Sequence, residues 1–146
     1  MIDGLALSLG AHPAVSALAT TILVLTALYF IGLALVAVVA PARFDSFLLG
    51  FAQSPSVHWL EMAIRILVGL ALWVESPEMP LPIVFRWGGI VLVTTSLLML
   101  ALPYRWHRRF AERAVPRALR YRPALSAVSA AIGVLLLACL WRDGNA

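Results

Sequence analysis

The stretch AVSALATTILVLTALYFIGLALVAVVA, residues 14–40, runs for 27 positions without a charged side chain. About 20 apolar residues in a helix are enough to cross the roughly 30 Å hydrocarbon core of a bilayer. Pro13 precedes the stretch and Pro41 follows it, and prolines in these places favour a helix that begins and ends there. The stretch is too long for a signal-peptide core and no basic segment precedes it, so we expect a retained membrane span.

Three further apolar runs follow, at residues 57–74, 83–102 and 124–141. The chain is 62% hydrophobic and 12% charged, whereas a soluble domain usually carries about 25% charged residues. A chain of 146 residues has too small a core to bury so much apolar surface in water. We therefore predict one all-α membrane domain over residues 1–146, a four transmembrane helix bundle with short interfacial helices in its two cytoplasmic connections.

Arginine is concentrated in one connection between the predicted spans. Seven of the eleven basic residues, all arginine, lie between Pro103 and Pro123. They are Arg105, Arg108, Arg109, Arg113, Arg117, Arg120 and Arg122. Cytoplasmic loops carry an excess of basic residues, so we expect this connection and residues 41–56 to lie inside. The predicted location is a bacterial inner membrane, with both termini in the periplasm.

Both predicted cytoplasmic connections carry amphipathic patterns. Between Arg43 and Gln53, four apolar side chains share one helical face: Phe44, Phe47, Leu48 and Phe51. This pattern is typical of an interfacial helix, or of a connector that packs on the bundle. In residues 104–122, Pro116 is expected to divide the chain into two short helices. The arginines there are candidates for contacts with anionic lipid or a partner, or serve only to fix topology.

The second span contains the one group of charged side chains inside an apolar run. His58, Glu61 and Arg65 are spaced i, i+3 and i+7 and so share one helix face. An arginine or an acidic residue near a helix centre costs about 2.5–3.5 kcal/mol on insertion. The nine Leu, Ile and Val residues of the span return about 3–5 kcal/mol together. We expect this helix to insert poorly alone and to depend on its neighbours.

Two interpretations of this intramembrane polar site stay open. In a functional pocket, Glu61 would be the protonatable group, Arg65 its electrostatic partner, and His58 would stand at the cytoplasmic mouth. Alternatively, Glu61 and Arg65 neutralise each other and hold the helices in register. Ser and Thr in membrane helices often bond to their own backbone. The possible partners on other spans are Thr20, Thr21, Thr26 and Tyr29 in the first span and Thr94, Thr95 and Ser96 in the third.

Small residues in two spans favour close helix packing. Gly88 and Gly89 lie near the start of the third span, and small side chains recur in the fourth at Ser126, Ser129, Ala130 and Gly133. Such residues let helix backbones approach each other. We expect them to serve packing within one chain rather than a dedicated dimer face.

No pattern of residues indicates catalysis, a cofactor or a metal. Cys139 is the only cysteine, so no internal disulfide forms. His58 and His107 lack the spacing of a haem or metal site. The arginines have no aqueous domain around them, which argues against nucleic acid. We expect no enzyme activity, no cofactor and no metal.

Two strings, HWLE at residues 58–61 and PYRWHRRF at residues 103–110, resemble small four-span proteins of bacterial inner membranes that have no assigned function. The resemblance implies a four-span fold and no activity. We expect an accessory or scaffold protein or a lipid-associated protein, whose partners are anionic headgroups at the cytoplasmic face, another membrane protein or further copies of the chain. The alternative is a small oligomeric transporter or proton-coupled carrier that uses Glu61 and Arg65.

Overall fold

The computed structural model describes residues 2–50, 55–102 and 104–143, and every regular element in these ranges is a helix. Four helices are long and apolar enough to cross a membrane. They are α2 (Pro13–Val39), α4 (Pro55–Glu75), α5 (Pro82–Ala101) and α7 (Arg122–Asp143). The four predicted spans fall on these helices, and every predicted end lies within two residues of an observed one.

Three shorter helices accompany the long ones: α1 (Ile2–Gly10), α3 (Pro41–Gly50) and α6 (Tyr104–Leu119). The helix predicted in the connection between the first two long helices is therefore present as α3, while Phe51 and Gln53 lie outside the described residues. Phe44, on its predicted apolar face, is buried. The location of α3 in the membrane interface stays a prediction.

Proline marks the beginnings of α2, α3, α4 and α5. A proline at the first helical position has no N–H to leave unsatisfied, and its fixed φ suits the helix. Pro41 also ends α2, since the residue before a proline avoids helical backbone angles. Ala40 accordingly leaves the helix at φ −139°, while its N–H still donates to the carbonyl of Val36.

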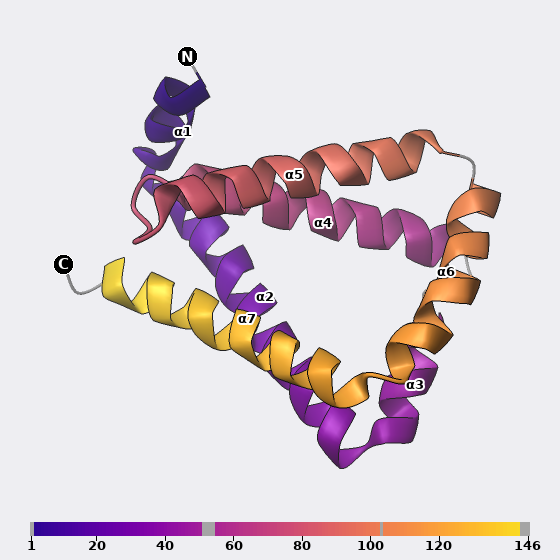
Figure 1. Ribbon diagram of the computed structural model, residues 1–146. Coiled ribbons are helices and arrows are strands. Elements are labelled where there is room, and N and C mark those ends of the chain that lie inside the picture. Colours follow the sequence, from indigo (N-terminus) through magenta and orange to yellow (C-terminus); the bar gives the residue numbers. More distant parts are fainter. Residues whose placement is uncertain (1, 51–54, 103, 144–146) are drawn as a thin grey trace.

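The long helices form two pairs. α2 packs along α7 and α4 packs along α5, and contact between α2 and α4 joins the pairs. Figure 1 shows α3 and α6 together at one end of the molecule, which we call the α6 end. Figure 1 also shows α1, the 76–81 turn and the last turn of α7 at the opposite end, the α1 end. The two connections predicted to be cytoplasmic thus lie at the same end.

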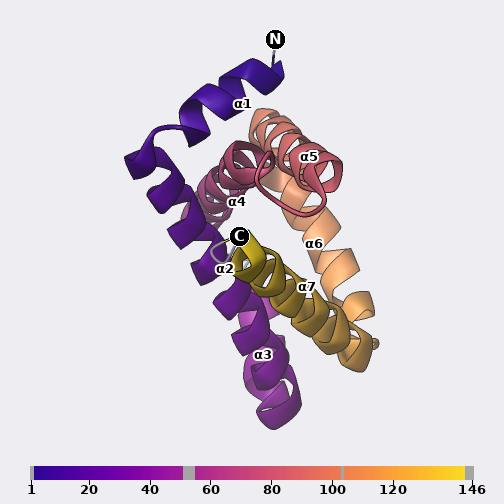
Figure 2. The ribbon, with the colours of Figure 1, turned by 90° about the vertical axis from the view of Figure 1, so that its left-hand side faces the viewer.

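The apolar core that joins the two pairs lies toward the α1 end. Its buried residues come from the first part of α2, the last part of α4, the following turn and the last part of α7: Ala19, Leu23, Ala27, Ala71, Val74, Met79 and Leu136. Toward the α6 end the two pairs diverge (Figure 1), and α6 connects α5 to α7 across that end (Figure 2).

Glycines set the spacing within each pair. A Cβ on Gly89 of α5 would lie 2.5 Å from the carbonyl oxygen of Gly69 on α4. In the other pair, a Cβ on Gly133 of α7 would lie 2.7 Å from the carbonyl oxygen of Ala27 on α2. Gly88 has no neighbour within 4 Å of a Cβ position, so of the two adjacent glycines only Gly89 serves this contact.

Two features of the fold differ from expectation. Pro116 does not divide its connection, because α6 runs as one helix from Tyr104 to Leu119 with the proline inside it. The proline lies in the last turn, so the helix loses one backbone hydrogen bond just before it would end anyway. The N-terminal segment, for which no helix was predicted, forms α1, which packs against α2 and α4 with Ala6 buried.

Candidate functional site

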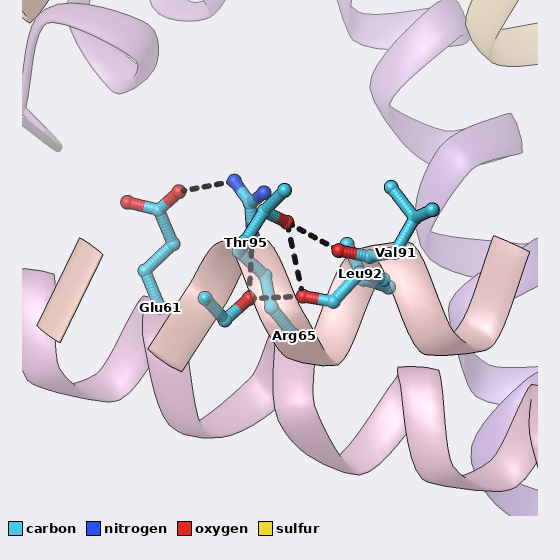
Figure 3. A network of polar contacts seen from close by, with 6 residues as sticks. Glu61, Arg65, Val91, Leu92 and Thr95 are labelled. Atoms are coloured by element: carbon cyan, nitrogen blue, oxygen red, sulfur yellow. Dashed lines mark hydrogen bonds and ion pairs between the residues drawn. The ribbon is translucent and has the colours of Figure 1, made fainter. Parts of the chain in front are cut away.

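Glu61 and Arg65 lie one turn apart on α4 and extend to the same side of the helix (Figure 3). Arg65 Nη1 is 3.5 Å from Glu61 Oε1, and the side chains are 33% and 24% exposed respectively. The order, with the acid four residues before the base, is the favourable one for an ion pair on a helix. The structure thus brings together the two charged residues singled out in the sequence.

Ser96 of α5 connects this ion pair to the neighbouring helix. Arg65 Nε donates to Ser96 Oγ at 3.2 Å, and Ser96 Oγ donates to the carbonyl of Leu92 at 2.6 Å. Ser96 is fully buried. Because the hydroxyl both accepts and donates, it fixes the guanidinium against α5 without leaving a buried polar atom unsatisfied.

Three of the threonines proposed as partners bond within their own helices. Thr95 Oγ1 donates to the carbonyl of Val91 at 2.7 Å, within α5. Thr21 and Thr26 of α2 bond in the same way to carbonyls one turn before them, as expected for hydroxyls in apolar helices. Tyr29 of α2 is about half exposed and stacks edge-to-face on Phe30, with ring centroids 5.6 Å apart.

His58 differs from the two charged residues in its surroundings. The residue is only 3% exposed, whereas the side chains of Glu61 and Arg65 remain partly exposed. The sequence placed it at a cytoplasmic mouth of the site, and that role stays a prediction. The buried position nevertheless makes His58 part of the helix packing at the first turns of α4.

A second ion pair, absent from the sequence-based prediction, joins α3 to the first residue of α7. Arg122 Nη2 lies 2.6 Å from Asp45 Oδ2, and Arg122 Nε donates to Asp45 Oδ1 at 3.1 Å. This bidentate geometry is the strong form of an arginine–carboxylate contact. One feature of the sequence favours this ion pair. Asp45 is the only acidic residue in its connection, and the arginine-rich connection was expected at the same membrane face.

The ion pair between Glu61 and Arg65 has fewer and longer contacts than the ion pair between Asp45 and Arg122. Asp45 and Arg122 use both oxygens and two nitrogens on each other, whereas Glu61 and Arg65 share one longer contact. Within the described part of the chain, no donor binds Glu61 Oε2 and no acceptor binds Arg65 Nη2. The site therefore presents an acceptor and a donor of opposite charge side by side, both partly accessible.

The arginines of α6 form the second candidate region. Arg109, Arg113 and Arg117 are exposed on the helix, and Arg120 is exposed just after it. The side chains of Arg105 and Arg108 lie outside the described residues. α6 also packs against α3 and α7, so its basic surface has a fixed position at the α6 end.

The described side chains include no cluster of three or more His, Cys, Asp or Glu residues that would suit a metal ion. Comparisons of the chain with protein-family models, curated proteins and solved structures find no match. The site geometry is therefore the basis for any proposal about function.

Proposed function

We propose that this chain is a multi-pass protein of a bacterial inner membrane that acts, without catalysis, as a lipid-associated accessory or scaffold protein. In this proposal α2, α4, α5 and α7 cross the bilayer as a four-helix bundle. The α6 end faces the cytoplasm and both termini face the periplasm. The arginine-rich connection supports this orientation, since basic residues favour the cytoplasmic side.

The observation that carries the proposal is the basic surface of α6. Four arginines at Arg109, Arg113, Arg117 and Arg120 are exposed on or directly after one helix that connects two apolar helices. A connection between two spans lies close to the membrane surface. There, each basic residue contributes about 1 kcal/mol of attraction to anionic headgroups. We therefore propose anionic lipids as ligands of this surface, with a membrane-protein partner or a second copy seated on the apolar helix faces.

The test is lipid retention by the purified chain. The protein would be reconstituted in nanodiscs that contain phosphatidylglycerol and phosphatidylcholine, extracted in mild detergent, and analysed by native mass spectrometry. The four arginines would be changed together to glutamine, and a matched variant would carry lysine at the same positions. Lysine keeps the charge but loses the planar guanidinium.

The expected result is enrichment of phosphatidylglycerol on the natural chain and the lysine variant, and loss of that enrichment in the glutamine variant. Equal lipid composition in all three would contradict the proposal for α6. Crosslinking in membranes would test the scaffold role separately. A chain found alone in every crosslinked sample, with no lipid enrichment, would refute the accessory proposal as a whole.

A small oligomeric transporter or proton-coupled carrier is the second candidate. The observation in its favour is the partial exposure of Glu61 and Arg65 within an apolar helix, because ionisable residues in such positions often lie on ion or substrate routes. Proton flux into liposomes would test it. Flux that requires Glu61 and Arg65 would support a carrier, whereas no flux, or flux unchanged in Glu61→Gln and Arg65→Gln, would exclude one.

A further inference from the structure

We infer that Glu61 and Arg65 together bind the headgroup of a zwitterionic phospholipid with a primary ammonium group, of the phosphatidylethanolamine class. The ammonium would donate to Glu61 and the phosphate would accept from Arg65. The inference rests on the proposed membrane setting but is independent of the arginines of α6. It assigns a ligand to the polar site of α4, where Glu61 and Arg65 keep unused bonding positions among the described residues.

The first step is the unused bonding capacity of the two side chains. Their one contact is 3.5 Å long, compared with 2.6 Å for the shorter contact between Arg122 and Asp45. Glu61 Oε2 and Arg65 Nη2 have no partner among the described residues. Charged groups in an apolar medium are costly unless each is paired and hydrogen-bonded, so a further polar group at this site lowers the free energy.

The second step is the direction of the charged groups. Side chains on a helix lean toward its N-terminus, and α4 begins at the α6 end. At 1.5 Å per residue, the backbone of Glu61 lies about 9 Å and that of Arg65 about 15 Å from the start of α4. The contact with Glu61 brings the guanidinium of Arg65 nearer to the α6 end. Headgroups of the leaflet at that end are therefore the nearest polar lipid groups.

The third step is access. The apolar core that joins the helix pairs lies toward the α1 end, and the pairs diverge toward the α6 end (Figure 1). Glu61 and Arg65 remain 24% and 33% exposed as a result. On the adjoining stripe of α4, Leu60, Ile64 and Leu67 are each more than half exposed. An acyl chain that lies along this stripe would place its headgroup beside the charged pair.

The fourth step is the choice of headgroup. The site offers one negative and one positive group side by side, which complements a ligand of opposite polarity with a short linker between its charges. Phosphatidylglycerol would bring a negative phosphate near Glu61 without a cation to balance that carboxylate. Phosphatidylcholine has a quaternary ammonium with no N–H to donate. Phosphatidylethanolamine has both the phosphate acceptor and the N–H donors.

The experiment is a lipid titration of the full chain in detergent, followed by native mass spectrometry. Short-chain phosphatidylethanolamine, phosphatidylcholine and phosphatidylglycerol would be compared at equal concentrations, with free phosphoethanolamine as a headgroup-only probe. The variants are Glu61→Gln and Arg65→Gln, with the α6 glutamine variant as the control for basic-surface binding. Circular dichroism and protection of the buried Cys139 from a thiol reagent would verify folding.

The expected result is one phosphatidylethanolamine bound per chain, retained about tenfold more strongly than the other two lipids. Each single variant would lose that preference, because removal of a charged hydrogen-bond partner lowers affinity about tenfold. The α6 variant would keep it. Binding that Glu61→Gln and Arg65→Gln leave unchanged, or equal retention of all three lipids, would overturn the inference. So would competition by free phosphoethanolamine as strong as that by the lipid.

This experiment distinguishes a variant that fails to fold from a failure of the inference, and a failure of the inference from a failure of the proposed function. A variant that fails the folding test would be replaced by Glu61→Asp or Arg65→Lys, which keep the charge and shift its position. A tenfold loss of preference in the folded replacement supports the site, and an unchanged preference counts against it. If the α6 variant alone changes lipid binding, the proposed function stands and this inference fails. If only Glu61→Gln and Arg65→Gln change lipid binding, this inference stands and the proposed lipid binding by α6 fails.

Discussion

Replacement of Gly89 by alanine should destabilise the contact between α4 and α5. The new Cβ would lie 2.5 Å from the carbonyl oxygen of Gly69 and 3.0 Å from the backbone nitrogen of Trp73. Both neighbours are backbone atoms, so the clash is relieved only if the helices move apart. Overpacking of this kind costs about 1–3 kcal/mol. Alanine also gains about 1 kcal/mol over glycine from helix propensity, which offsets part of that cost.

Gly88→Ala is the matched control, because it has the same propensity gain and no atom within 4 Å of its Cβ position. The difference between the two variants cancels the propensity term and should equal the overpacking cost of about 1–3 kcal/mol, with Gly89→Ala the less stable. A thiol-reactive fluorophore measures unfolding directly, since the only cysteine, Cys139, is buried. Equal unfolding midpoints for the two variants in mixed micelles would refute the close crossing of α4 and α5.

Three further predictions concern other contacts. Gly133→Ala should be less stable than Gly32→Ala by about 1–3 kcal/mol, because only the first places a Cβ against the backbone of α2; equal midpoints in the same assay would contradict the prediction. Asp45→Asn and Arg122→Gln should show a coupling of about 1 kcal/mol in a double-mutant cycle, since the pair is about one-third exposed; an additive cycle would show that the contact contributes nothing. Ser96→Ala should cost about 1 kcal/mol in the same unfolding assay, because the guanidinium loses its acceptor on α5, whereas unchanged stability would exclude this link.

The positions of the long helices were predictable because length, apolar composition and flanking prolines are local properties. Pro13, Pro41 and Pro82 stand where α2, α3 and α5 begin, and the absence of charge in residues 14–40 fixes the longest helix. The short helices were harder to predict. α1 depends on packing against α2 and α4, which no local pattern shows. The effect of Pro116 depends on where its helix ends, three residues later, and the local sequence does not show that end.

The site was predictable in part. Spacing alone placed Glu61 and Arg65 within reach of each other, because positions i and i+4 of a helix are neighbours. Ser96 stood among several hydroxyl candidates, and only the packing of α5 on α4 distinguishes it from Thr95, which bonds within its own helix. The contact between Asp45 and Arg122 spans 77 positions and depends on the meeting of two connections, which no spacing rule determines.

The most direct test of the membrane topology is the accessibility of single cysteines in intact spheroplasts. In a Cys139→Ala background, Glu78→Cys lies in the turn at the α1 end and Arg113→Cys lies on α6, and both natural side chains are exposed. A membrane-impermeant maleimide should label the cysteine at position 78 in intact spheroplasts and that at position 113 only after lysis. Labelling of position 113 before lysis, with position 78 protected, would reverse the orientation, and labelling of both in intact spheroplasts would contradict the four crossing helices.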